Sequence, residues 1–113
     1  MKPGGYFLIV AASGLALSSV ATLGLSVPAS AATLQITMRD LEITPAAADA
    51  KVGDTIEWVN EDIFVHTATA RNGDWDVTLP PNKTVKLVLK KPGTIDYHCR
   101  FHPNMKARLT ISP

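Results

Sequence analysis

The chain has 113 residues, enough for one domain of ordinary size. Eleven Lys and Arg residues nearly balance ten Asp and Glu residues, and the formal net charge of +1 gives no sign of the basic surface that binds nucleic acid. A single cysteine excludes an internal disulfide.

The first third of the chain is apolar and almost free of charge. No Asp, Glu, Lys or Arg occurs between Lys2 and Arg39. Lys2 precedes an Ala/Leu/Val-rich stretch from Tyr6 to about Val27, and the segment PASAA that follows contains the small residues in A-x-A order that signal peptidase accepts.

This pattern predicts that residues 1–31 form a secretory signal peptide that is cleaved near Ala31. Residues 32–113 would then be an exported, periplasmic domain. The alternative is an uncleaved membrane anchor, because about 20 apolar residues can span a bilayer. Serines and glycines within the run favour cleavage.

Beyond residue 32 the chain consists of short β-branched runs separated by Pro, Gly, Asn and Asp, with no helical period. The spacing of the runs, and the absence of a helix that could serve as a crossover, predict an all-β fold of about seven strands, either a two-sheet sandwich or a small barrel. The candidate strands are Thr33–Met38, Glu42–Ile43, Thr55–Asn60, Thr67–Ala70, Thr84–Lys90, Thr94–Cys99 and Lys106–Ile111.

The segment YHCRFHPNM contains three candidate metal donors. Cys99, His102 and Met105 recur at every third residue, so a tight loop after a strand could fold them around one point. His66, at the end of an earlier candidate strand, is a possible fourth donor. An unpaired cysteine in an exported protein indicates an intermolecular bridge, a reactive thiol or a metal ligand.

The chemistry of this donor set favours copper. Two imidazoles, one thiolate and one weak thioether are the set expected of a blue-copper electron-transfer site. Zinc fits less well because its structural sites use four nitrogen or thiolate ligands, and haem attachment would need a second cysteine. A site closed by Met105 would leave no coordination position for a substrate, so we expect a carrier and not an enzyme.

Several neighbouring residues are assigned simpler roles. Adjacent strand side chains point to opposite faces, so His98 should face away from a metal bound by Cys99. Asn60 could either bond the ligand-loop backbone or form a turn. Glu61 and Asp62 are expected to be a solvated acidic pair, and Phe64 to pack in the interior or support the loop.

These residues resemble the cupredoxins, the family of blue copper proteins, and among them the amicyanins, with plastocyanins and pseudoazurins as more distant relatives. The resemblance spans about residues 33–113. It is carried by Tyr97-His98-Cys99-x-x-His102-Pro103-x-Met105, which is similar to the short amicyanin ligand loop, and by Trp58-Val59-Asn60 followed by His66.

The resemblance implies a Greek-key two-sheet sandwich with one type 1 copper ion. His66, Cys99 and His102 would be equatorial ligands and Met105 the axial ligand. It also implies a monomeric electron carrier between redox proteins, with a dehydrogenase as donor and a c-type cytochrome or an oxidase as acceptor, and no nucleic acid partner.

Two residues depart from the family pattern. Thr67 follows the first histidine where the family commonly has Asn, whose backbone N–H bonds the cysteine sulfur and whose side chain ties the two ligand loops together. Thr67 is expected to replace the side-chain tie only in part. Phe101 stands where Pro often precedes the second histidine, and together with Pro103 it would form an apolar docking patch.

Two other functions are compatible with the same residues. A copper-trafficking protein would share the ligands but exchange the metal under mild conditions. A metal-free β-sandwich interaction module would use Cys99 only as a small buried side chain, as isolated cysteines often are.

Overall fold

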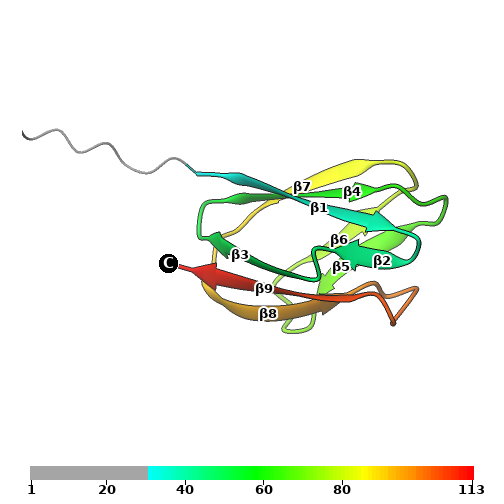
Figure 1. Ribbon diagram of the computed structural model, residues 1–113. Coiled ribbons are helices and arrows are strands. Elements are labelled where there is room, and N and C mark those ends of the chain that lie inside the picture. The colour runs from blue at the N-terminus through cyan, green and yellow to red at the C-terminus, as the bar shows by residue number, and fades with distance from the viewer. Residues whose placement is uncertain (1–30) are drawn as a thin grey trace, which may run out of the picture. The chain divides into compact units, whose positions relative to one another are not determined.

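The computed structural model describes residues 31–113 as a sandwich of two β-sheets (Figure 1). The predicted leader, residues 1–31, lies outside the described residues except for Ala31. No helix in the described part is long and apolar enough to cross a bilayer. The strands are β1 Thr33–Arg39, β2 Glu42–Thr44, β3 Ala47–Lys51, β4 Thr55–Asn60, β5 His66–Ala70, β6 Asp76–Leu79, β7 Thr84–Val88, β8 Gly93–His98 and β9 Lys106–Ser112.

Five of the eight connections between consecutive strands cross from one sheet to the other, whereas the β1–β2, β5–β6 and β8–β9 connections stay within one sheet. One sheet has the order β2-β1-β4-β7 and the other the order β3-β9-β8-β5-β6. β1 runs parallel to β4, and β3 runs parallel to β9, while the other pairs are antiparallel. The prediction of an all-β two-sheet sandwich is therefore confirmed.

All seven predicted strands are present, with ends shifted by no more than two residues. The expected number was too low, because β3 and β6 were not predicted. β3 reads Ala-Ala-Asp-Ala-Lys and contains no β-branched or aromatic residue, so its sequence carries no strand signal. It forms because its parallel pairing with β9, from Ala47↔Arg108 to Lys51↔Ser112, satisfies its backbone groups.

The core lies between the sheets and is built by alternation along the strands. In β9 every second residue is buried, and the same pattern in β4 buries Ile56 and Trp58 completely. Trp58 donates its indole N–H to the hydroxyl of Tyr97 at 3.3 Å, which links the two sheets. Burial raises the pKa of Tyr97 to about 12, although this hydrogen bond opposes the rise.

Three connections meet at one end of the sandwich. They are the β1–β2 turn at residues 40–41, the β4–β5 loop at residues 61–65 and the β8–β9 loop at residues 99–105 (Figure 1). In the β1–β2 turn both Asp40 and Leu41 have positive φ, 54° and 63°, as a two-residue type I′ hairpin requires. This end of the domain carries the candidate site.

The opposite end is closed by the carboxylate of Asp54. Its Oδ1 accepts the N–H of Ala32 at 2.9 Å, and its Oδ2 accepts the N–H of Lys51 at 2.9 Å, so it joins the start of β1 to the end of β3. These two backbone hydrogen bonds hold the pKa of Asp54 below its usual value of 3.8.

Asp54→Asn is expected to destabilise the fold in a pH-dependent way. Because the pKa of Asp54 is lower in the folded chain, its stabilisation is present above about pH 4 and is lost as the pH falls through the folded-state pKa. The deficit of the variant in free energy of unfolding should be largest at neutral pH and should shrink below pH 3.8, the ordinary value. Urea unfolding across this range measures it.

Asp49→Asn is the matched control, because Asp49 is exposed on the neighbouring β3 and its replacement removes the same charge. An Asp54→Asn deficit that does not change with pH would contradict the assigned role of the carboxylate.

Candidate metal centre

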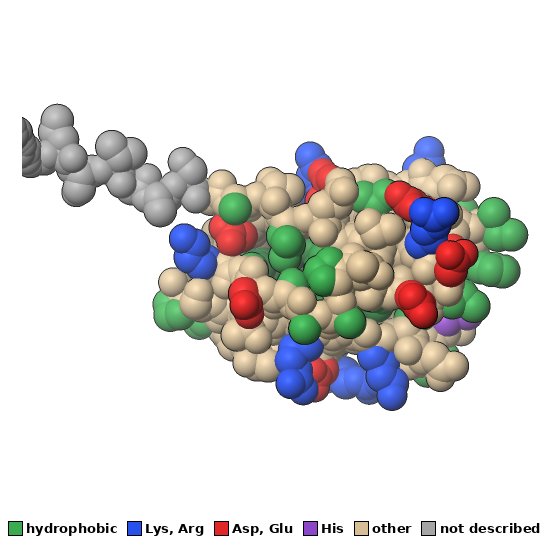
Figure 2. Space-filling model, in the orientation of Figure 1, with side chains coloured by type: hydrophobic (Ala, Val, Ile, Leu, Met, Phe, Trp, Pro, Cys, Tyr) green, Lys and Arg blue, Asp and Glu red, His purple; other side chains and the backbone are tan. Residues whose placement is uncertain are grey.

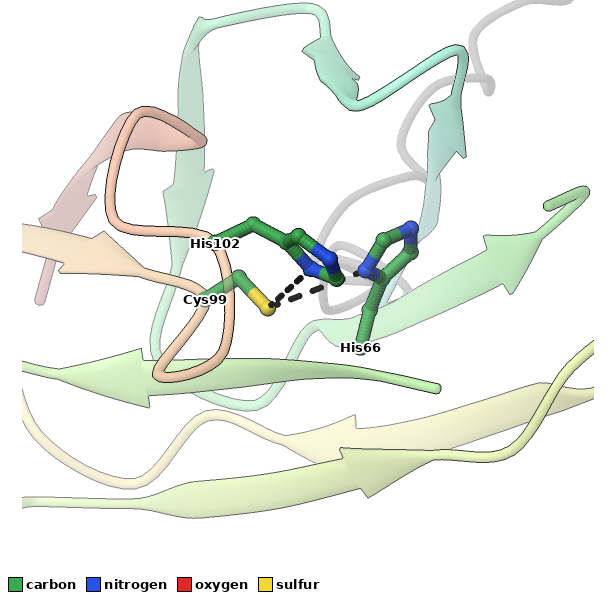
Figure 3. Close-up of side chains that lie close together, drawn as sticks. All are labelled: His66, Cys99 and His102. Carbon is green, nitrogen blue, oxygen red and sulfur yellow. Dashed lines mark hydrogen bonds between the residues drawn. The ribbon is translucent and has the colours of Figure 1, made fainter. Parts of the chain in front are cut away.

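Three candidate donors converge at the end of the sandwich where the three connections meet. Sγ of Cys99 lies 3.7 Å from Nδ1 of His66 and 3.7 Å from Nδ1 of His102, and the donor atoms of the three residues all lie within 4.8 Å of one another (Figure 3). His66 and Cys99 are fully buried and His102 is partly exposed.

These separations fit one shared metal ion. With bonds of about 2.3 Å to sulfur and about 2.05 Å to nitrogen, a sulfur and a nitrogen set 120° apart around one ion lie about 3.8 Å from each other. The set of one thiolate and two imidazoles, with a buried methionine in the same loop, fits copper in chemistry as well as in spacing. The two imidazole rings meet edge to face, with centroids 5.0 Å apart.

The β8–β9 loop is closed by its own backbone. The N–H of Met105 donates to the carbonyl of His102 at 2.9 Å, and the N–H of Cys99 donates to the carbonyl of Met105 at 3.1 Å. Met105 is almost completely buried. The turn thus brings Cys99 and His102 together, as their spacing indicated, and Met105 is buried at its end.

His66 reaches the same point because Asn60 holds its loop. The two amide hydrogens of Asn60 are shared among the carbonyls of Phe64, Leu79 and Pro80, and its Oδ1 accepts the N–H of Asp62. Both roles considered for Asn60 are therefore present, since it shapes the turn and bonds the backbone of a ligand loop.

Thr67 ties the two ligand loops together more completely than expected. Its N–H donates to Sγ of Cys99 at 3.4 Å, and its Oγ1 accepts the N–H of Arg100 at 2.8 Å. The hydroxyl thus provides the side-chain tie that Asn commonly supplies in the family, at the backbone of the residue after the cysteine.

The hydroxyl of Thr67 also begins a directed hydrogen-bond chain. Thr69 must donate its proton to the carboxylate of Asp76, 2.8 Å away, because an ionised carboxylate only accepts. Thr67 therefore donates to Thr69 across 2.8 Å. Asp76 also pairs with Nε of Arg100 at 3.4 Å. The hydrogen bond from Thr69 is the main cause of the lowered pKa of Asp76.

The structure corrects two assignments made from the sequence. Asp62 was expected in solvent, but it is buried and contacts His66, with its Oδ2 2.7 Å from Nε2. Phe64 was expected to pack in the interior or to support the loop, and the interior placement is wrong, because the side chain is half exposed with its ring centroid 5.7 Å from that of His102. The sequence carries no signal for either placement beyond their nearness to His66.

His98 does not belong to the cluster. Among residues 31–113, the group of side chains that could hold a metal contains His66, Cys99 and His102, as strand parity predicted. Within the same part of the chain, Nδ1 of His98 is the one buried side-chain nitrogen or oxygen without a hydrogen-bond partner.

Comparison with known proteins agrees with the fold and the cluster. The cupredoxin-like domain family matches residues 7–111. The chain is 30% identical over 91 residues to the methylamine utilization protein MauL of Methylorubrum extorquens, covering 77% of this chain and 80% of that protein. It is 33% identical over 67 residues to amicyanin of Paracoccus denitrificans, and this match covers 54% of the chain but only about half, 51%, of the amicyanin.

Solved structures show the same fold. A reduced amicyanin variant with a proline-to-phenylalanine replacement aligns with a TM-score of 0.61 at 23% identity, covering 71% of this chain and 82% of that one. A purple cupredoxin from Nitrosopumilus maritimus aligns with a TM-score of 0.61 at 23% identity, covering 70% and 99%. The chain belongs to the cupredoxin-like family, and its cluster of His66, Cys99, His102 and Met105 is typical of a type 1 copper site.

Thr67→Val is expected to lower the stability of the metal-free protein by about 1–3 kcal/mol, because the N–H of Arg100 and the hydroxyl of Thr69 both lose a partner. Urea unfolding of the metal-free domain measures the loss. Thr110→Val, on the exposed face of β9, is the matched control and should change stability by no more than about 0.5 kcal/mol. Equal effects of the two substitutions would show that the hydroxyl of Thr67 does not hold the loops together.

Proposed function

We propose that the protein is a type 1 blue-copper electron carrier that cycles one copper ion between Cu(II) and Cu(I). His66, Cys99 and His102 would be the equatorial ligands and Met105 the axial ligand. The observation that supports this most directly is the convergence of one buried thiol and two Nδ1 atoms within 4.8 Å, in a chain of the cupredoxin-like family.

The protein would hold the copper ligands rigidly and leave the edge of the His102 ring partly exposed. Cys99 and His66 are buried and held by hydrogen bonds from Thr67 and to Asp62, so their positions need to change little when the oxidation state changes. The N–H of Thr67 would stabilise negative charge on the sulfur. Bound copper would supply the redox couple, and the partly exposed ring of His102 would be the route for the electron.

The surface around His102 suits short-lived contact with a protein partner. The three connections at this end expose large apolar side chains, namely Leu41, Ile63, Phe64 and Phe101. Figure 2 shows hydrophobic side chains at this end of the domain beside a histidine. The nearby charges of Arg100 and Asp76 are paired. A small apolar patch with a polar rim is typical of carriers that must dissociate quickly.

The partners would be other redox proteins, a dehydrogenase as electron donor and a c-type cytochrome or an oxidase as acceptor. Similarity to an amicyanin and to a methylamine utilization protein supports this choice. We further propose that residues 1–31 direct export to the periplasm and are removed, and that the domain acts there as a monomer and not as an enzyme. The intact mass of the exported chain tests the cleavage.

Adding Cu(II) to the purified domain is expected to give an intense visible thiolate-to-copper band that bleaches on reduction and returns on oxidation. Cys99→Ser should bind copper without this band, because an alcohol oxygen is a poor charge-transfer donor. No band in the native protein would contradict the electron-carrier proposal. Rapid loss of copper to a mild chelator, with no stable blue form, would instead identify a copper-trafficking protein.

Substitutions of Met105 test the axial ligand. Met105→Gln is expected to lower the reduction potential, because an oxygen donor favours Cu(II), whereas Met105→Leu should raise it by removing a donor. Met38→Leu, at the other buried methionine of the domain, should leave the potential unchanged. Voltammetry measures all three. Shifts of the same sign for the two Met105 variants would point to disturbed packing and not to ligation.

A further inference from the structure

We propose that Asp62 is a positioning residue that fixes the tautomer and the orientation of His66. We also infer that the carboxylate lowers the reduction potential of the centre, and this second part rests on the proposed function. Asp62 is four residues before His66 in the same loop, and nothing in its sequence context distinguishes it from the exposed Glu61.

The contact between the two side chains determines where the imidazole proton lies. Nε2 of His66 is 2.7 Å from Oδ2 of Asp62, and the histidine is fully buried. An ionised carboxylate can only accept, so Nε2 must carry the proton. Nδ1, 3.7 Å from Sγ of Cys99, therefore presents its lone pair to the position between the donors (Figure 3).

Backbone groups keep this buried carboxylate ionised. Oδ1 accepts the N–H of Asp40 at 2.7 Å, and Oδ2 accepts the N–H of Leu41 at 3.1 Å. Three hydrogen bonds thus reach the two carboxylate oxygens, and hydrogen bonds of this kind favour the ionised form of a carboxyl group.

The same carboxylate holds the turn next to the site. Asp40 and Leu41 both lie in the left-handed region of φ, an unfavourable conformation for leucine. The exposed side chain of Leu41 lines a cavity with Phe101, His102 and Met105. Asp62 therefore connects the buried His66 to Leu41, whose side chain lines the cavity beside the partly exposed His102.

A carboxylate in this position has a chemical consequence for a bound metal. A histidine ligand that donates its second N–H to a carboxylate becomes a stronger electron donor, and loss of such a partner typically reduces metal affinity about 10–100-fold. Greater electron donation favours Cu(II) over Cu(I). Removing the charge should therefore raise the reduction potential.

Asp62→Asn is the sharpest substitution, because it keeps the size and removes one acceptor. Three donors converge on the two oxygens of Asp62. Asn offers one oxygen and one NH₂ group, so in either orientation one backbone N–H must face another donor. If the oxygen stays on the shorter bond from Asp40, the NH₂ group also faces Nε2 of His66, which must then accept. Glu61→Gln is the matched control, since it removes one negative charge from the adjacent residue, whose carboxylate pairs with Arg39 and not with His66.

The first experiment uses the metal-free protein and does not depend on the proposed function. Long-range ¹H–¹⁵N NMR correlations distinguish the two tautomers of His66. The wild type and Glu61→Gln should show the Nε2–H form alone, and Asp62→Asn should gain the Nδ1–H form. An Nδ1–H form in the wild type would overturn the proposal whether or not the variant folds, as would an unchanged tautomer in Asp62→Asn.

The second experiment measures the copper-loaded protein. Asp62→Asn should have a higher potential than Glu61→Gln and bind Cu(II) about 10–100-fold more weakly in competition with a chelator. Equal potentials and affinities in the two variants would overturn the tuning role. If the wild type forms no blue centre, the proposed function fails, but the NMR result on the tautomer of His66 stands independently.

Discussion

The hydrogen bonds between Thr67 and the β8–β9 loop hold the site at the point where the β5–β8 ladder opens. β5 and β8 pair only at Thr69↔His98 and Ala70↔Tyr97. Beyond these pairs, hydrogen bonds that involve side chains replace the backbone ladder. The N–H of Thr67 donates to the sulfur of Cys99, and the hydroxyl of Thr67 accepts the N–H of Arg100. The widened end of the ladder is where the thiol and the imidazoles meet.

Burying polar groups at the end of an apolar sandwich is costly unless each finds a partner. Here the two amide hydrogens of Asn60 are shared among three backbone carbonyls, and the carboxylate of Asp62 accepts three hydrogen bonds. Together they hold the β4–β5 loop and the β1–β2 turn against the end of the core. Such preorganisation suits a redox centre, whose ligands should move little as the charge of the metal changes.

Much of the fold could be predicted because alternation and turn residues are local signals. Strands with long alternating runs, such as β4 and β9, were located from the sequence, whereas the four-residue β6, with only Val77 and Thr78 as β-branched residues, was not. β3 could not be, because its alanines have no strand preference and its pairing with β9 spans most of the domain. At the site, the regular spacing of Cys99, His102 and Met105 was visible in the sequence, whereas the contact of Asp62 with His66 was not.

The sequence by itself determined the chemical types of the donors and their spacing within one loop, since these are properties of neighbouring residues. It also determined that His98 points away from the cluster, because side chains alternate along a strand. Only the tertiary structure decided which nitrogen of His66 faces Cys99, that Asp62 is buried, and that Leu41 and Phe64 lie on the surface near His102. These features depend on contacts between connections that are far apart in the chain, and no local pattern encodes how such connections meet.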